Sequence, residues 1–307
     1  MAPAKYLVLL FVVVLVALSF PVFQKAPLPM ENPRPEPEDV SISISPAKVF
    51  QGDPALIVVN NLGSTSTIKS LTFDGKEISV FNYVNKPSVL VGIDLRGRVG
   101  PHPIVVTLSD GRSIKKDLIV GERTIVQVPM GIPEELGGNT PEAEQELLNT
   151  LVQEAKIISA IPVSREKLWS SAFRLPLSGG AVITDTYGYS RLTGASTTAH
   201  KGTDFRASIG TPVYAINSGV VRFTRNMRNY GNAIAIDHGT GVLSIYMHLS
   251  AIDVELGQEV EKGELIGKSG NTGYVLGPHL HLTIRINGIS IDPIKFVELL
   301  GQETTKR

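Results

Sequence analysis

Short segments of alternating apolar and polar residues run through residues 40–130 of the chain. Successive side chains of a strand point to opposite faces, so this pattern predicts half-buried β-strands. Asp74-Gly75 and Asp110-Gly111 stand between such segments and are typical of tight hairpin turns. Because strands at about ten-residue spacing favour a small sandwich, we predict an immunoglobulin-like β-sandwich over residues 40–130.

The pattern changes to a helical period in the next segment, residues 131–172, which we predict to be a helical connector. Thr140 is placed to cap a helix whose first position is Pro141. The apolar stripe that follows has helical spacing and comprises Leu147, Leu148, Leu151, Val152 and Ala155. We expect this stripe to pack on a neighbouring domain, and we expect Trp169 to pin the junction with the segment that follows.

Residues 173–300 return to strand-like patterns separated by glycine turns and by a Ser/Thr-rich loop before His200. Strands are predicted at 213–216, 219–224, 233–237 and 243–247. The charged stretch 256–264 is expected to be a solvated hairpin. The fold class is therefore mainly β: an N-terminal sandwich and a C-terminal antiparallel β-sheet domain, joined by the helical connector.

The chain begins with an apolar run behind Lys5 that continues from Tyr6 through Leu18 and on to Phe23. A membrane-spanning helix needs about 17–25 such residues and the core of a signal peptide about 7–15. Residues 1–23 are therefore an N-terminal membrane anchor or a signal peptide, and we favour the uncleaved anchor because the apolar character extends to Phe23. Residues 24–39 form a Pro-rich linker that would act as a spacer.

Composition limits the kinds of binding partner and metal ligand that the chain can have. Basic and acidic residues number 29 each among 307 residues, so no overall charge attracts nucleic acid, and the length suits two modest domains. The chain has no cysteine. Disulfides and thiolate ligands are therefore excluded, and a metal site would have to use His, Asp and Glu.

Five residues of the C-terminal domain have the chemistry of a metal-assisted active site. His279 and His281 alternate with apolar residues, so both would lie on one strand face, where they could share a metal or divide metal binding from proton transfer. His200 and Asp204 add a nitrogen and an oxygen donor, and His248 ends a strand-like run. The two other histidines give no comparable signal of a metal or catalytic site. We predict His102 to be a loop residue and His238 to be a turn residue.

The motifs His200-x-x-x-Asp204, Tyr246-x-His248-Leu249 and His279-x-His281 together resemble the lysostaphin-like M23 (LytM-domain) peptidoglycan metallopeptidases. The resemblance covers about residues 175–295 and includes the glycine turns of that family. Leu282-Thr283 departs from the family pattern, in which an aromatic and an acidic residue are common. We expect that departure to affect substrate fit rather than metal binding.

The resemblance implies a zinc endopeptidase whose metal ligands are His200, Asp204 and His281. His279 and His248 would lie beside the zinc ion, with His279 favoured as the base and His248 as the oxyanion stabiliser or proton donor, although the two roles could be reversed. Peptide bonds of bacterial peptidoglycan would be the substrate, with specificity set by residues 188–199 and 225–231. The expected location is the cell envelope, in the periplasm or on the outer face of the cytoplasmic membrane.

A function of another class stays open beside this one. Some LytM-like domains lose metal ligands and act as non-catalytic binding modules that activate other wall hydrolases. Retention of all five residues favours the enzyme.

Overall fold

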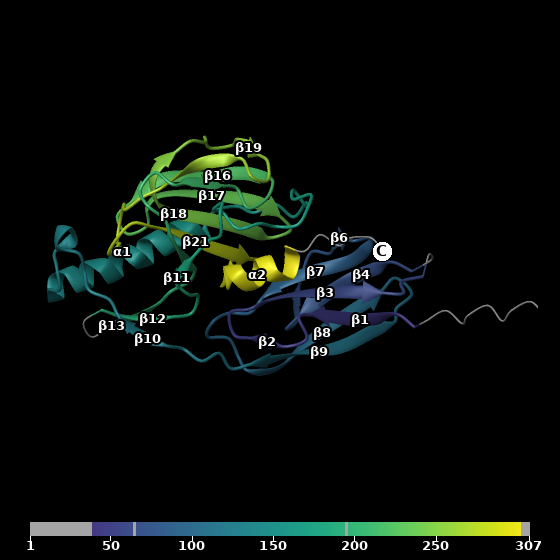
Figure 1. Ribbon diagram of the computed structural model, residues 1–307. Coiled ribbons are helices and arrows are strands. Elements are labelled where there is room, and N and C mark those ends of the chain that lie inside the picture. Colours follow the sequence, from purple (N-terminus) through teal and green to yellow (C-terminus); the bar gives the residue numbers. More distant parts are fainter. Residues whose placement is uncertain (1–38, 64–65, 194–195, 302–307) are drawn as a thin grey trace, which may run out of the picture. The chain divides into compact units, whose positions relative to one another are not determined.

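Strands dominate residues 39–63, 66–193 and 196–301, which a computed structural model describes (Figure 1). The mainly β fold class is confirmed. The predicted anchor over residues 1–23, and the linker up to residue 38, lie outside the described residues. Among the residues that the structure does describe, no helix is long and apolar enough to span a membrane.

Two sheets built from residues 41–121 share one apolar core. The first has the strand order β1–β3–β7–β6, namely Ser41–Ser45, Pro54–Asn60, Lys86–Gly92 and Phe81–Tyr83. The second has the order β2–β9–β8–β4–β5, namely Val49–Phe50, Ser113–Gly121, Gly100–Leu108, Ile68–Phe73 and Lys76–Glu77. The immunoglobulin-like assignment and the domain boundaries stay predictions.

Strand β3 explains why one segment of this region is apolar at nearly every position. Ile57 faces the core between the two sheets, whereas Leu56 belongs to the core of the C-terminal sheet. A strand that is buried on both faces reads as a continuous apolar run instead of an alternation. Helix α2 (Pro293–Leu300), which begins after the cap Asp292, lies in contact with the same strand.

His102 is not a loop residue. It lies in β8 with 5% of its surface exposed, and its ring stacks on Phe73. Nδ1 lies 2.5 Å from Oδ2 of Asp74, and Nε2 lies 2.8 Å from the carbonyl oxygen of Arg98. The β4–β5 hairpin brings Asp74 to His102 across 28 residues, so spacing along the chain gives no sign of the contact.

Helix α1 (Pro141–Ser159) begins as predicted, because the amide of Ala143 donates to Oγ1 of the N-cap Thr140 at 3.2 Å. The predicted buried stripe is partly wrong. Val152 is 54% exposed, and the buried face includes Leu147, Ile158 and the carboxylate of Glu154. Before the helix come β10 (Gln127–Pro129) and the short η1 (Glu134–Leu136).

The C-terminal sheet has the strand order β11–β14–β21–β18–β17–β16–β19 (Figure 1). These strands are Ile183–Asp185, Thr203–Arg206, His279–Ile286, Val242–Ile252, Gly231–Gly239, Gly219–Met227 and Glu259–Val260. Further strands at its margins are β15 (Pro212–Tyr214), β20 (Leu265–Ser269) and β22 (Ile289–Ile291). All strand-to-strand pairings in this sheet are antiparallel, and each of the four predicted strands overlaps an observed one.

Two predictions for this domain need correction. The segment before His200 is not a loop but the hairpin β12 (Ser190–Thr193) and β13 (Ser196–Ala199), which pairs with β10 in a separate sheet. His238 is a fully buried strand residue, and burial lowers its pKa to about 4.

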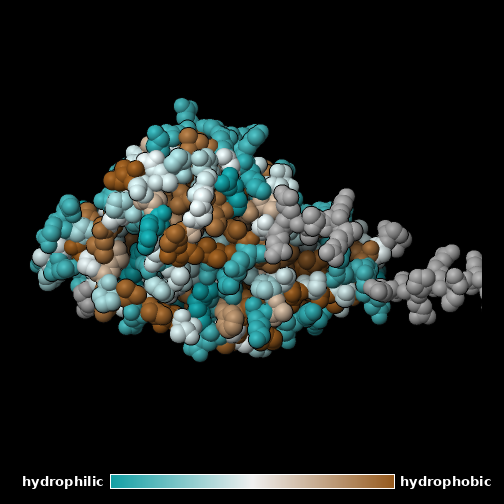
Figure 2. All heavy atoms as spheres, viewed as in Figure 1, coloured by the Kyte–Doolittle hydropathy of each residue, from teal (hydrophilic) through white to brown (hydrophobic). Residues whose placement is uncertain are grey.

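The predicted charged hairpin at 256–264 carries β19, and Figure 2 shows a hydrophilic rim where Figure 1 places that strand.

Trp169 contacts residues of the N-terminal β-structure and of the C-terminal domain. Its ring packs against Phe81, Tyr83 and Phe173 at centroid distances of 5.9, 5.7 and 5.3 Å. The indole Nε1 donates to Oγ1 of Thr240 at 3.2 Å, so the polar end of this buried ring is also satisfied.

Candidate active site

Strand β21 places both of its histidines at one end of the sheet. His281 lies opposite Asp204 of β14 on one side and opposite Met247 of β18 on the other. His279 is two positions earlier, so its side chain stands on the same face. The strand order therefore brings together segments that are about 80 residues apart.

His200, Asp204 and His281 form a buried cluster. Oδ1 of Asp204 lies 3.1 Å from Nε2 of His200 and 2.7 Å from Nδ1 of His281, and the two nitrogens are 3.1 Å apart. Their exposed fractions are 3%, 4% and 7% in sequence order. One ligand atom from each residue lies within 4.8 Å of the others, so the three could contact a single ion.

The outer nitrogen of each imidazole is held by a partner, which sets the tautomer. Nδ1 of His200 lies 2.9 Å from the carbonyl oxygen of Thr186, to which it can only donate. Nε2 of His281 lies 2.9 Å from Oγ1 of Thr283, whose hydroxyl donates to the carbonyl oxygen of Lys201 at 3.0 Å. Nε2 of His200 and Nδ1 of His281 are thereby left with lone pairs that face Asp204.

The pKa shifts of Asp204 and His281 suit the binding of a divalent cation. Burial by itself raises the pKa of Asp204, but His281 and His200 lower it well below its usual value. Burial lowers the pKa of His281 to about 4, against the opposing effect of Asp204. Two neutral imidazoles and one carboxylate are the donors that a catalytic zinc site uses, with a fourth position open for water. The residues therefore fit a zinc ion.

His279 and His248 lie beside this cluster. Their ring centroids are 4.8 Å apart, and Nε2 of His279 is 3.8 Å from Oδ1 of Asp204. Each Nδ1 again faces a carbonyl oxygen, that of Gly277 for His279 (2.8 Å) and that of Thr272 for His248 (2.9 Å). Burial and the neighbouring histidines lower the pKa of His248 well below its usual value. Its neutral ring therefore presents Nε2 as an acceptor.

His248 does not end its strand. It lies within β18 at a φ of 62°, between Met247, which pairs with β21, and Leu249, which pairs with β20. At this residue the strand changes its neighbour. The left-handed backbone conformation, which is rare for a residue with a side chain, accompanies that change.

Comparison with known proteins identifies the domain that carries the site. Residues 198–293 match peptidase family M23. These residues form an M23 domain.

Named relatives match the M23 domain over a similar length. Peptidoglycan DD-endopeptidase ShyA of Vibrio cholerae is 49% identical over 96 residues, which are 31% of this chain and 22% of that protein. DD-carboxypeptidase/endopeptidase Mpg of Neisseria meningitidis is 46% identical over 95 residues, again 31% of this chain and 22% of that protein. The chain thus spans less than a quarter of the length of these relatives.

A solved structure extends the likeness beyond the M23 domain. The crystal structure of a putative peptidase M23 from Pseudomonas aeruginosa aligns with a TM-score of 0.60 at 25% identity. The alignment covers 81% of this chain and 95% of that chain. The β-structure that precedes the M23 domain is therefore part of a shared architecture.

The five residues His200, Asp204, His248, His279 and His281 are called the M23 site below. Sequence reasoning missed two residues that shape this site. A Cβ at Gly202 would lie 2.3 Å from Nε2 of His281 and 2.5 Å from the carbonyl oxygen of Leu282, so only glycine fits. Thr283, which we expected to influence substrate fit, instead contacts His281 and lies on the side away from Asp204. The role of Gly202 depends on the approach of two distant segments, so no spacing signal points to it. Thr283 is two residues from His281 on the same strand face, so strand alternation could have pointed to that contact.

A cleft of about 490 Å³ opens onto the M23 site. Its lining combines His200, His248 and His281 with residues from three other regions. These are Asp94, Leu95 and Arg96 of the N-terminal β-structure, Leu148, Leu151 and Val152 of α1, and Thr197, Thr198, Asn229 and Tyr230.

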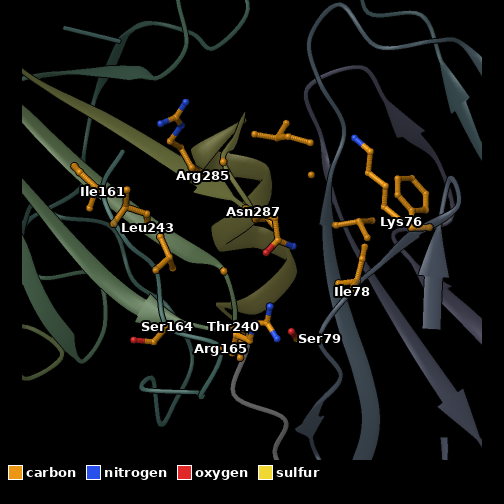
Figure 3. Close-up of a pocket in the computed structure, with 18 of the residues that line it drawn as sticks. Lys76, Ile78, Ser79, Ile161, Ser164, Arg165, Thr240, Leu243, Arg285 and Asn287 are labelled. Atoms are coloured by element: carbon orange, nitrogen blue, oxygen red, sulfur yellow. The ribbon is translucent and has the colours of Figure 1, made fainter. Parts of the chain in front are cut away.

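A second cavity, of about 640 Å³, lies away from the histidines (Figure 3). Lys76 and Ile78 lie on one side of it and Ile161 and Leu243 on the other. Its lining contains no histidine, and its only carboxylate is Glu77. It therefore offers no metal site comparable with that of the M23 domain.

Proposed function

We propose that this protein is a zinc-dependent peptidoglycan endopeptidase. The observation that carries the proposal is the convergence of His200, Asp204 and His281 on one point, with His248 and His279 beside it. An M23 domain that serves only for binding has no need of the full set. The names of the relatives favour a bond between two D-amino acids as the one that is cut.

Zinc held by His200, Asp204 and His281 would lower the pKa of a water molecule and polarise the scissile carbonyl. His279 is the favoured base, because its Nε2 carries the lone pair and its strand is fixed next to His281. Neutral His248 likewise accepts at Nε2, so it can donate to an oxyanion or a leaving amine only after it has gained a proton. The reverse division of labour uses the same geometry.

An endopeptidase must also orient an extended substrate, and the cleft provides a surface for this. Thr197 and Thr198 form part of its lining, and so do Asn229 and Tyr230. These residues belong to the segments 188–199 and 225–231, which we propose as the determinants of specificity.

Digestion of purified peptidoglycan by the purified protein tests the proposal. Cross-linked fragments should be converted to uncross-linked ones with the addition of one water per bond cut, as measured by mass spectrometry. A chelator should stop the reaction, and added zinc should restore it. Cleavage that continues in the chelator, or no cleavage by the zinc-loaded protein, would refute the proposal.

The location is proposed from the sequence. We infer that the protein is exported to the cell envelope and held at the membrane by residues 1–23. Sequencing of the mature N-terminus tests this inference, because a start at or near Phe20 would indicate cleavage of a signal peptide.

A further inference from the structure

Arg191 binds the one oxygen of Asp204 that the histidines leave free. Its Nη2 donates to Oδ2 of Asp204 at 2.6 Å and to Oδ2 of Asp185 at 3.0 Å. Both imidazole contacts of Asp204 are made through Oδ1. The two oxygens of this carboxylate therefore have separate partners. Arg191 lies outside residues 198–293, which the family match covers.

Backbone pairing fixes the position of Arg191. It lies in β12, where it is paired with Thr198 of β13 on one side and with Val128 of β10 on the other. Only 16% of its side chain is exposed, and its Nε is buried without a hydrogen-bond partner. A buried guanidinium that is only partly satisfied costs free energy. Such a cost is expected where the group has a role beyond the stability of the fold.

We propose that Arg191 is a positioning residue for the metal site. It orients Asp204 so that this carboxylate binds the metal through one oxygen only. The inference depends on the proposed function, because it requires a metal ion at His200, Asp204 and His281. A carboxylate that is free to rotate could bind through both oxygens and take the position needed by water. The hydrogen bond to Oδ2 opposes that rotation, and Asp185 helps to hold the guanidinium in place by accepting from the same Nη2.

A simple salt bridge between strands is the competing explanation, and it predicts different results. Loss of such a bridge would lower the stability of the metal-free protein and leave metal affinity nearly unchanged. Loss of a positioning residue would weaken metal binding and alter the ligand geometry. Partners that orient a metal ligand typically contribute about 10- to 100-fold in metal affinity or activity.

The test compares Arg191→Met and Arg191→Lys with a matched control, Arg222→Met, in the full-length protein. Arg222 also pairs with a buried carboxylate, since its Nε lies 3.4 Å from Oδ2 of Asp237, but it contacts no residue of the cluster. The measurements are zinc affinity by competition with a coloured chelator, the visible spectrum of the cobalt-substituted protein, and the unfolding midpoint without metal.

Arg191→Met should bind zinc about 10- to 100-fold more weakly and shift the cobalt bands, with a fall in kcat larger than any change in KM. Arg191→Lys should be intermediate, because an ammonium keeps the positive charge and the donors but places them on a more flexible stem than the planar guanidinium. Asp185→Asn should change affinity in the same direction by less, and it serves if Arg191→Met does not fold. Arg222→Met should retain the affinity and spectrum of the unaltered protein.

Unchanged zinc affinity and cobalt spectrum in Arg191→Met would overturn the positioning role. Equal weakening in Arg222→Met would do so too, because it would indicate general loosening of the fold. Failure of the unaltered protein to bind zinc would instead overturn the proposed function, and the positioning role with it.

Discussion

Replacement of His281 with alanine should leave the protein with almost no zinc and no measurable turnover. The change removes one of three donors, and two protein ligands rarely retain zinc. It also removes the donor whose Nδ1 lies closest to Asp204, at 2.7 Å. The expected zinc content, measured by elemental analysis after gel filtration, falls from about one per chain to near zero.

His238→Ala is the matched control for this variant. His238 is a buried histidine of the same sheet, where Nδ1 lies 2.8 Å from the carbonyl oxygen of Ser218 and Nε2 2.8 Å from Oγ of Ser244. Its loss should lower the unfolding midpoint but spare zinc binding. Full zinc content in His281→Ala would show that the ligand assignment is wrong.

Replacement of His279 with alanine should separate catalysis from metal binding. The variant should keep its zinc and its fold, because Nε2 of His279 lies 3.8 Å from Oδ1 of Asp204, farther than either proposed ligand nitrogen. Turnover should fall about 10²- to 10⁴-fold, the range of general acid–base groups. The measurements are zinc content and the rate of release of uncross-linked fragments on the same preparation.

His248→Ala should give a similar result, and the double variant should lose less than the product of the two single losses. Groups that serve one transition state act as a unit, so their effects do not add. A near-normal rate in His279→Ala would make that residue a bystander. Loss of zinc in the same variant would mean that His279 and His281 have exchanged roles.

The spacing of polar residues indicated the five candidate residues that the structure brings together, because strand alternation and motif order are local properties of a sequence. His279 and His281 share a face for this reason. Gly202 and Arg191 could not be found in this way. Each contacts a residue of a distant segment, and the pairing of those segments follows from the whole sheet.

The errors in the fold also have physical causes. His238 precedes a glycine and was predicted to be a turn residue, but the turn is made by Gly239, Thr240 and Gly241, which all have positive φ. On α1, Glu154 is buried because its carboxylate accepts from the amides of Asn229 and Tyr230. Apolar periodicity carries no sign of a buried acid whose partners are backbone amides some 75 residues away.

The place of β21 in the sheet determines when, during synthesis, the proposed metal site can form. This strand is near the end of the chain, yet it lies between β14 and β18, which are made earlier. Domains form during synthesis from the N-terminus onward. A nascent chain that has not yet reached residue 279 therefore holds His200, Asp204 and His248 without their partners. The three proposed metal ligands come together only when β21 joins the sheet, so a nascent chain that ends before this strand lacks a complete metal site.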